Sequence, residues 1–95
     1  MEIRIYQEIN PKFRVDENVR FVDKKEYKKV FERKEVVNCR SDYQILEDLF
    51  LEFNRGNYPE EYQGHSMSVG DIVEFENKVF ICVSCGWDRV DWRES

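Results

Sequence analysis

Residues 64–75, GHSMSVGDIVEF, contain the only histidine of the chain, two serines close to it and an aspartate that precedes an apolar run. A serine nucleophile needs a base within hydrogen-bond reach, an orienting acid and an oxyanion hole. Adjacent residues of an extended chain point to opposite sides, so His65 and Ser66 are poorly placed to pair. The stretch also lacks the G-x-S-x-G nucleophile elbow. We therefore interpret it as a turn that leads into a strand.

The expected turn combines hydrogen-bonding side chains with flexible backbone. Serine hydroxyls in such segments bond to nearby backbone groups. The Gly70-Asp71 pair is typical of a chain reversal, and the strand is expected to begin at Ile72. The turn is expected to be built from Gly64, His65, Ser66, Ser68, Gly70 and Asp71.

The length of 95 residues predicts a single domain over residues 1–95. No apolar run is long enough for a transmembrane helix. The opening MEIRIYQEIN alternates charged and apolar residues and has no apolar signal-peptide core. Three cysteines is an odd number, which indicates reduced thiols when an export signal is lacking. We therefore expect a cytoplasmic protein.

Hydrophobic periodicity predicts an α+β fold, with a mostly antiparallel sheet of about four to six short strands and two helices packed on it. The run 79–83 is apolar throughout, as in a strand that is covered on both faces. Asn77-Lys78 separates it from the preceding strand, and that pair of strands is typical of a hairpin. Strands are expected at residues 2–9, 19–22, 35–39, 72–76, 79–84 and 87–92.

Two segments have the spacing of amphipathic helices. Tyr27, Val30 and Phe31 fall at i, i+3 and i+4, so residues 24–32 fit a short helix. Lysines occupy the opposite face of that expected helix. Residues 45–53 fit a second helix, in which one side is apolar and the other is acidic.

Charge is divided unevenly along the chain. Residues 1–41 hold eleven Lys/Arg against eight Asp/Glu, a net +3, whereas residues 42–95 hold four against twelve, a net −8. Generic nucleic-acid binding needs cations that release phosphate counterions, so this balance argues against it. It leaves open binding to a basic surface on a partner protein. The residues expected to bind that partner are Glu47, Asp48, Leu51, Glu52, Glu60, Glu61 and Asp88.

The sequence Cys82-Val83-Ser84-Cys85 is a C-x-x-C motif. Together with Cys39 and His65 it has the ligand types of a Cys₃His zinc site. No second paired motif accompanies it, and a redox pair would stand at a helix N-terminus, which the pattern here does not predict. We expect free thiols with no metal and no cofactor. The sequence leaves open whether Cys39, Cys82, Cys85 and His65 converge.

Two stretches of the second half, LEDLFLEFN (46–54) and YPEEYQGHSMSVGDIVEFENKVFICVSCGW (58–87), resemble the YodL-like domain family. The family pattern is a short acidic helix ending near FN, then P-x-x-[FY]-x-G-[RH]-S-[LM]-S-V-[SG]-D-[IV]-[IV], and a hairpin closing on S-x-G-[FW]. The opening of the chain is also similar, so the resemblance covers most of it. Cys85 stands where the family usually has an aromatic residue and Val83 where it often has an acid, so the cysteine pair is particular to this sequence.

The resemblance implies a small protein of Gram-positive mobile genetic elements, and it carries over no catalytic residues. It also implies work at the conflict between element and host, such as protecting incoming DNA from restriction or CRISPR effectors. We therefore expect a non-enzymatic protein-binding domain that inhibits a host defence nuclease, of anti-CRISPR or anti-restriction type, through an acidic surface. The alternatives are a nucleic-acid-binding accessory protein that uses the Lys24–Lys29 face and aromatic residues, and an enzyme that uses His65.

Overall fold

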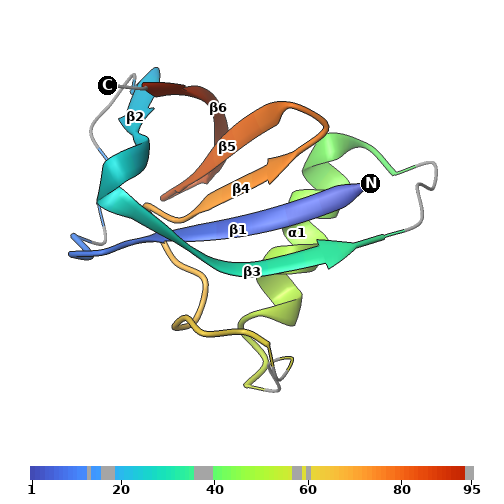
Figure 1. Cartoon of the computed structure of the whole chain (residues 1–95). Helices are drawn as coiled ribbons and strands as arrows, with labels where there is room; N and C mark the ends of the chain where they lie inside the picture. Colours follow the sequence, from blue (N-terminus) through green and yellow to red (C-terminus); the bar gives the residue numbers. More distant parts are fainter. Residues whose placement is uncertain (13, 16–18, 36–39, 57–58, 60, 94–95) are drawn as a thin grey trace.

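The computed structural model in Figure 1 describes residues 1–12, 14–15, 19–35, 40–56, 59 and 61–93. These residues form a six-stranded sheet with the strand order β2-β6-β5-β4-β1-β3. All neighbours are antiparallel except β2 and β6, which run parallel. The sheet curls like half a barrel (Figure 1). Its strands are β1 (Glu2–Glu8), β2 (Phe21–Asp23), β3 (Tyr27–Lys34), β4 (Ile72–Phe75), β5 (Lys78–Val83) and β6 (Gly86–Arg93).

The described residues contain one α-helix, α1 (Asp42–Glu52), and one 3-10 turn, η1 (Lys24–Glu26), where two packed helices were expected. At the start of α1 the hydroxyl of Ser41 accepts a hydrogen bond from the backbone N–H of Gln44 at 3.2 Å, which caps the helix. The helix crosses one face of the sheet (Figure 1), which we call the helix face. Within the described residues no helix is both long and apolar enough to cross a bilayer.

The helix predicted over residues 24–32 is wrong, because η1 and the first part of β3 occupy that segment. Ile5 of β1 pairs with Phe31, but the next residue of β1 pairs with Lys29, so Val30 is an extra residue in β3. This is a β-bulge. It allows Val30 and Phe31 to be buried in the same apolar cluster, although neighbours in a regular strand point to opposite faces. Tyr27 packs against the apolar cluster on the other face of the sheet, so the three residues with helical spacing do not share one face.

Five of the six expected strands correspond to strands of the sheet. Their ends differ from the expected ends by at most two residues. The strand expected at 35–39 is not observed at Glu35, and residues 36–39 lie outside the described residues. The turn of the β4–β5 hairpin is formed by Glu76 and Asn77, whose φ angles of 52° and 63° are those of a turn that follows the twist of the strands. The strands that match are β1, β2, β4, β5 and β6.

The two faces of the sheet carry separate apolar clusters. On β5, Phe80 and Cys82 belong to the helix-face cluster, whereas Val79 and Ile81 belong to the cluster on the other side, which we call the far face. Alternation along a strand produces this division. The helix-face cluster is closed by the apolar side of α1. The far-face cluster has side chains from β2 and β6 packed on it, among them Val22.

Leu46→Ala is expected to lower the free energy of unfolding by about 2–5 kcal/mol, because Leu46 is fully buried under α1 and its removal leaves a cavity. Leu51→Ala is the matched control on the same helix. Leu51 is 54% exposed, so its substitution is expected to change stability by no more than about 0.5 kcal/mol. Urea unfolding of the two variants measures both values. Similar losses for both leucines would contradict the placement of α1.

Candidate functional site

A buried polar cluster lies where the expected turn crosses β1. The side chain of Gln7, which is fully buried, is its centre. Its Oε1 accepts a hydrogen bond from the backbone N–H of His65 at 3.0 Å. Its Nε2 lies 2.9 Å from both the Tyr62 hydroxyl and Asp71 Oδ2, and 3.0 Å from the His65 carbonyl oxygen. An amide nitrogen has two hydrogens, so these acceptors share them. The amide fastens the turn to the sheet.

Asp71 forms the second anchor of this cluster. Its Oδ2 accepts hydrogen bonds from the backbone N–H of Ser68 and from Gln7, each at 2.9 Å. The residue is only 3% exposed, and burial raises the pKa of its carboxyl group to about 6. The hydrogen bonds from Ser68 and Gln7 act in the opposite direction and lower this pKa, but burial outweighs them. The imidazole of His65 lies at the edge of the cluster, with Nδ1 2.7 Å from the Ser66 carbonyl oxygen.

The structure places most of the expected turn residues around Gln7. At Gly64 a Cβ atom would lie 2.1 Å from Gln7 Oε1, so the backbone passes too close to the amide for a side chain. Gly70 has a φ of 99°, which favours glycine. Ser66 is exposed. We interpret the cluster as architectural, and catalysis by His65 stays a prediction.

Sequence reasoning did not single out Gln7. A signal was present, since Gln7 follows Ile3 and Ile5 at intervals of two and therefore points to the same buried face. A glutamine in such a position requires polar partners, because an amide buried without hydrogen bonds costs about 1–3 kcal/mol. Those partners come from residues 62–71, far away in the sequence.

The acidic residues of α1 differ in how far they are neutralised. Arg40 Nη1 lies 2.7 Å from Asp48 Oδ2. Arg33 donates two hydrogen bonds to the carboxylate of Glu52, at 2.8 and 3.0 Å. These carboxylates have their own cations and offer little charge to a partner. Glu47 is exposed and has no ion pair within the described part of the chain.

Among the other acids that were expected to bind the partner, Asp88 lies on a different face of the molecule from Glu47. Asp88 of β6 pairs with Ile81, which belongs to the far-face cluster, so Asp88 projects from the sheet face opposite α1. Glu61 is exposed in the segment that precedes the turn. Glu60 lies outside the described residues. Within the described residues, Glu47 and Asp88 therefore do not belong to one continuous acidic surface.

The outward side of α1 carries a stripe that sequence reasoning found only in part. Tyr43, Glu47 and Leu51 are spaced four residues apart, one above another on the helix surface. Tyr43 is 56% exposed and Leu51 is 54% exposed, and both are among the large exposed apolar side chains of the molecule. We call these three residues the outer stripe. The sequence could have indicated Tyr43, because it stands four residues before Glu47 and eight before Leu51 on the same expected helix.

A groove with a volume of about 520 Å³ lies beside the outer stripe. Three parts of the chain line it: α1, the turn segment and the β5–β6 hairpin. We call it the helix–hairpin groove. It is lined by Glu47 and Phe50, by Met67, Ser68 and Val69, and by residues 82–87.

The two described cysteines differ in their surroundings. Cys82 is buried, and burial raises the pKa of its thiol to about 11, with the negative charges of Asp71 and Glu47 acting in the same direction. Cys85 is exposed in the hairpin turn. Cys39 lies outside the described residues. Among the residues that the structure describes, no group of three or more His, Cys, Asp or Glu is placed to hold a metal ion.

The lysines of the expected first helix do not form a helical face. Lys28 and Lys29 are neighbours in β3, so their side chains leave on opposite sides. Lys29 Nζ lies 2.9 Å from Glu32 Oε2, and Lys24 Nζ lies 5.6 Å from the centroid of the Trp92 ring. The nucleic-acid alternative therefore loses the lysine stripe on which it was based.

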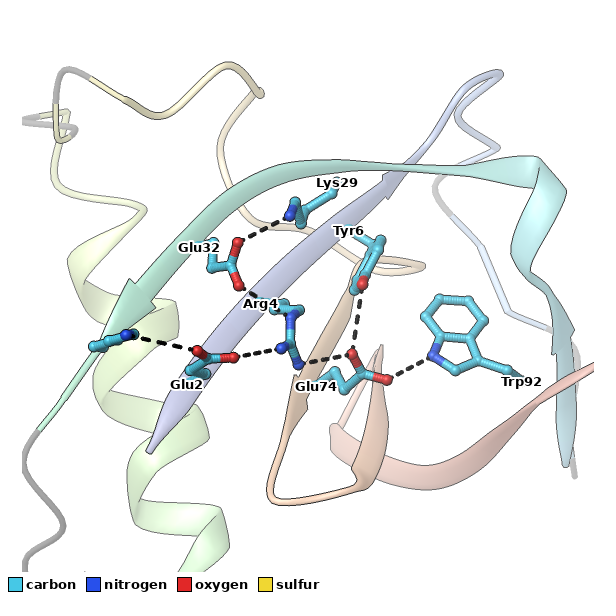
Figure 2. Close-up of polar contacts among 8 residues, drawn as sticks. Glu2, Arg4, Tyr6, Lys29, Glu32, Glu74 and Trp92 are labelled. Atoms are coloured by element: carbon cyan, nitrogen blue, oxygen red, sulfur yellow. Dashed lines mark hydrogen bonds and ion pairs between the residues drawn. The ribbon is translucent and has the colours of Figure 1, made fainter.

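The far face of the sheet carries an ion cluster centred on Arg4. Figure 2 shows its guanidinium among three carboxylates, those of Glu2, Glu32 and Glu74. Glu74 also accepts a hydrogen bond from Trp92 Nε1 at 2.9 Å and one from the Tyr6 hydroxyl at 3.4 Å. The cluster joins β1, β3, β4 and β6. Lys29 and Lys34 pair with Glu32 and Glu2, so three cations balance the three carboxylates and the cluster supplies little net field for a partner.

A family model described as the YodL-like domain matches residues 2–92, nearly the whole chain. No curated protein and no solved structure matches the chain.

Gly64→Ala is expected to destabilise the fold by about 1–3 kcal/mol, because the added methyl group would overlap the Gln7 amide. In a Gln7→Ala background the same substitution is expected to cost much less, because the overlapping atoms are absent. Denaturant unfolding of the four proteins gives a double-mutant cycle. Equal costs in both backgrounds would contradict the contact.

The raised pKa of Asp71 predicts a pH dependence of stability. The folded state holds the proton up to about pH 6, whereas the unfolded state releases it near 3.8. The stabilisation is therefore complete below the unfolded pKa and is lost as the pH rises through the folded pKa, by up to about 3 kcal/mol.

Urea unfolding between pH 4 and pH 7.5 tests this dependence. Asp71→Asn is expected to show a smaller decline in the free energy of unfolding than the unmodified chain. Asp88→Asn, in which an exposed carboxylate is changed, is the control and is expected to keep the decline. Parallel curves for Asp71→Asn and the unmodified chain would refute the assignment.

Proposed function

Since the chain belongs to the YodL-like domain family over nearly its whole length, we propose that it is a non-enzymatic domain that binds another protein through the outward side of α1. The observation that carries this proposal is the outer stripe. Tyr43 and Leu51 expose large apolar surfaces on either side of Glu47. An exposed leucine alone is common, but two such side chains on one helix, next to a groove, form a connected surface.

The chemistry of the outer stripe suits a protein partner. Full burial of an exposed leucine side chain contributes about 1.5–3 kcal/mol, and Leu51, at 54% exposure, has about half of its surface left to bury. Tyrosine is enriched among the residues that dominate binding energy at interfaces. Glu47 adds a carboxylate without an ion pair in the described part of the chain, which favours a partner with a nearby cation.

The partner class that we propose is a host defence nuclease of the CRISPR or restriction type. Such a nuclease handles nucleic acid through cationic surfaces, which a compact acidic domain complements in charge. The carboxylate of Glu47, which has no ion pair within the described part of the chain, supports this choice. On this proposal the chain acts in the cytoplasm on behalf of a mobile genetic element.

Glu47→Lys is expected to weaken binding to the partner about tenfold and to reduce its salt dependence, because a favourable charge pair becomes a repulsion. Asp88→Lys is the matched control, since it makes the same charge change on the opposite face of the sheet. The partner is first isolated from host lysate, and binding is then measured by titration at several salt concentrations. Unchanged affinity and salt dependence for Glu47→Lys would refute docking through the charge of the outer stripe.

A further inference from the structure

The helix–hairpin groove adjoins the outer stripe at Glu47, which belongs to both. Its volume of about 520 Å³ is within the usual range of about 300–1,000 Å³ for sites that bury a ligand. Phe50, Val69 and Val83 are half-buried at its walls, and Met67 and Trp87 are buried. A lining of aromatic, aliphatic and sulfur-containing side chains suits a bulky apolar group.

The electrostatics of the groove have one sign. Glu47 is the sole charged side chain among the described residues that line it. The thiol of Cys82, which also lines the groove, is affected by the same negative potential. Burial raises its pKa, and the negative charges of Asp71 and Glu47 raise it further. A cation beside the groove is therefore favoured, and an anion is disfavoured.

From these two observations we infer that the groove binds a segment of a partner protein in which a bulky apolar side chain stands beside Lys or Arg. The apolar side chain fills the space between α1 and the β5–β6 hairpin, and the cation pairs with Glu47 at the rim. This inference rests on the proposed protein-binding function. It adds the chemistry of the part of the partner that binds.

The test selects peptides from a random phage-displayed library on the Cys39→Ser chain. A bulky maleimide label on Cys85, which is exposed at the groove, blocks the site without a change in the core. Cys82 is spared because it is buried and its raised pKa keeps it as the unreactive thiol. The control carries the same label at the exposed Lys34 position, introduced as Lys34→Cys in a Cys39→Ser, Cys85→Ser chain.

The expected outcome is enrichment of peptides that contain a bulky apolar residue next to Lys or Arg. Their affinity is expected to fall about tenfold or more with the Cys85 label and with Glu47→Lys, and to be unchanged by the label on β3. Glu47→Gln is expected to retain the apolar preference and to lose the basic one. These results together would support the inference.

Three outcomes would overturn the inference: no enrichment, enrichment without basic residues, or binding that the Cys85 label does not affect. Each is distinct from failure of the proposed function. If the peptides fail but Glu47→Lys weakens binding to the isolated partner, the protein-binding function stands and the groove is excluded. If the peptides bind in the groove but Glu47→Lys leaves partner binding unchanged, the groove is a site and the docking proposal fails.

Discussion

The fold depends on one buried amide. Gln7 extends from the second half of β1 into the helix-face side of the sheet, where a glutamine without partners would be unfavourable. The segment between α1 and β4 supplies those partners through His65, Tyr62 and Asp71. This contact connects the start of the chain to a segment more than fifty residues away. Because it fixes where the segment crosses β1, it also sets where β4 begins and how the 67–69 wall of the groove faces α1.

The division of the sheet into two faces determines which surface is available for binding. On the far face, Arg4 and its three glutamates are engaged with one another and with Trp92 (Figure 2). On the helix face, Asp48 and Glu52 have arginine partners. The outward side of α1 therefore presents the outer stripe, in which Glu47 is an acid without an ion pair among the described residues. The acidic residues that the structure describes form ion pairs or lie on separate surfaces. An acidic composition therefore does not by itself indicate an acidic binding site.

Residues 24–32 show why local pattern can mislead. In a regular strand, Val30 and Phe31 could not both face the helix-face cluster, and their spacing from Tyr27 fits a helix. The bulge opposite Ile5 buries both in that cluster, whereas Tyr27 packs on the far face. Only pairing with β1 selects the strand, and that pairing is a long-range contact invisible to periodicity. Prediction of the candidate site was limited in the same way. Glu47 and Asp88 are both acidic residues of the second half of the chain, but they lie on opposite faces of the sheet.

The sequence by itself determined the elements whose information is local: the β4–β5 hairpin, the helix over residues 42–52, most strand positions and the family to which the chain belongs. Alternation, helical spacing and turn residues suffice for these, since each depends on neighbours within a few positions. Tertiary structure decided the bulge in β3, the burial of Gln7, the ion pairs of Asp48 and Glu52, and the groove beside Glu47. Apart from the pair of Asp48 with the nearby Arg40, each of these arises from residues that are distant in the chain and become neighbours only when the strands pair.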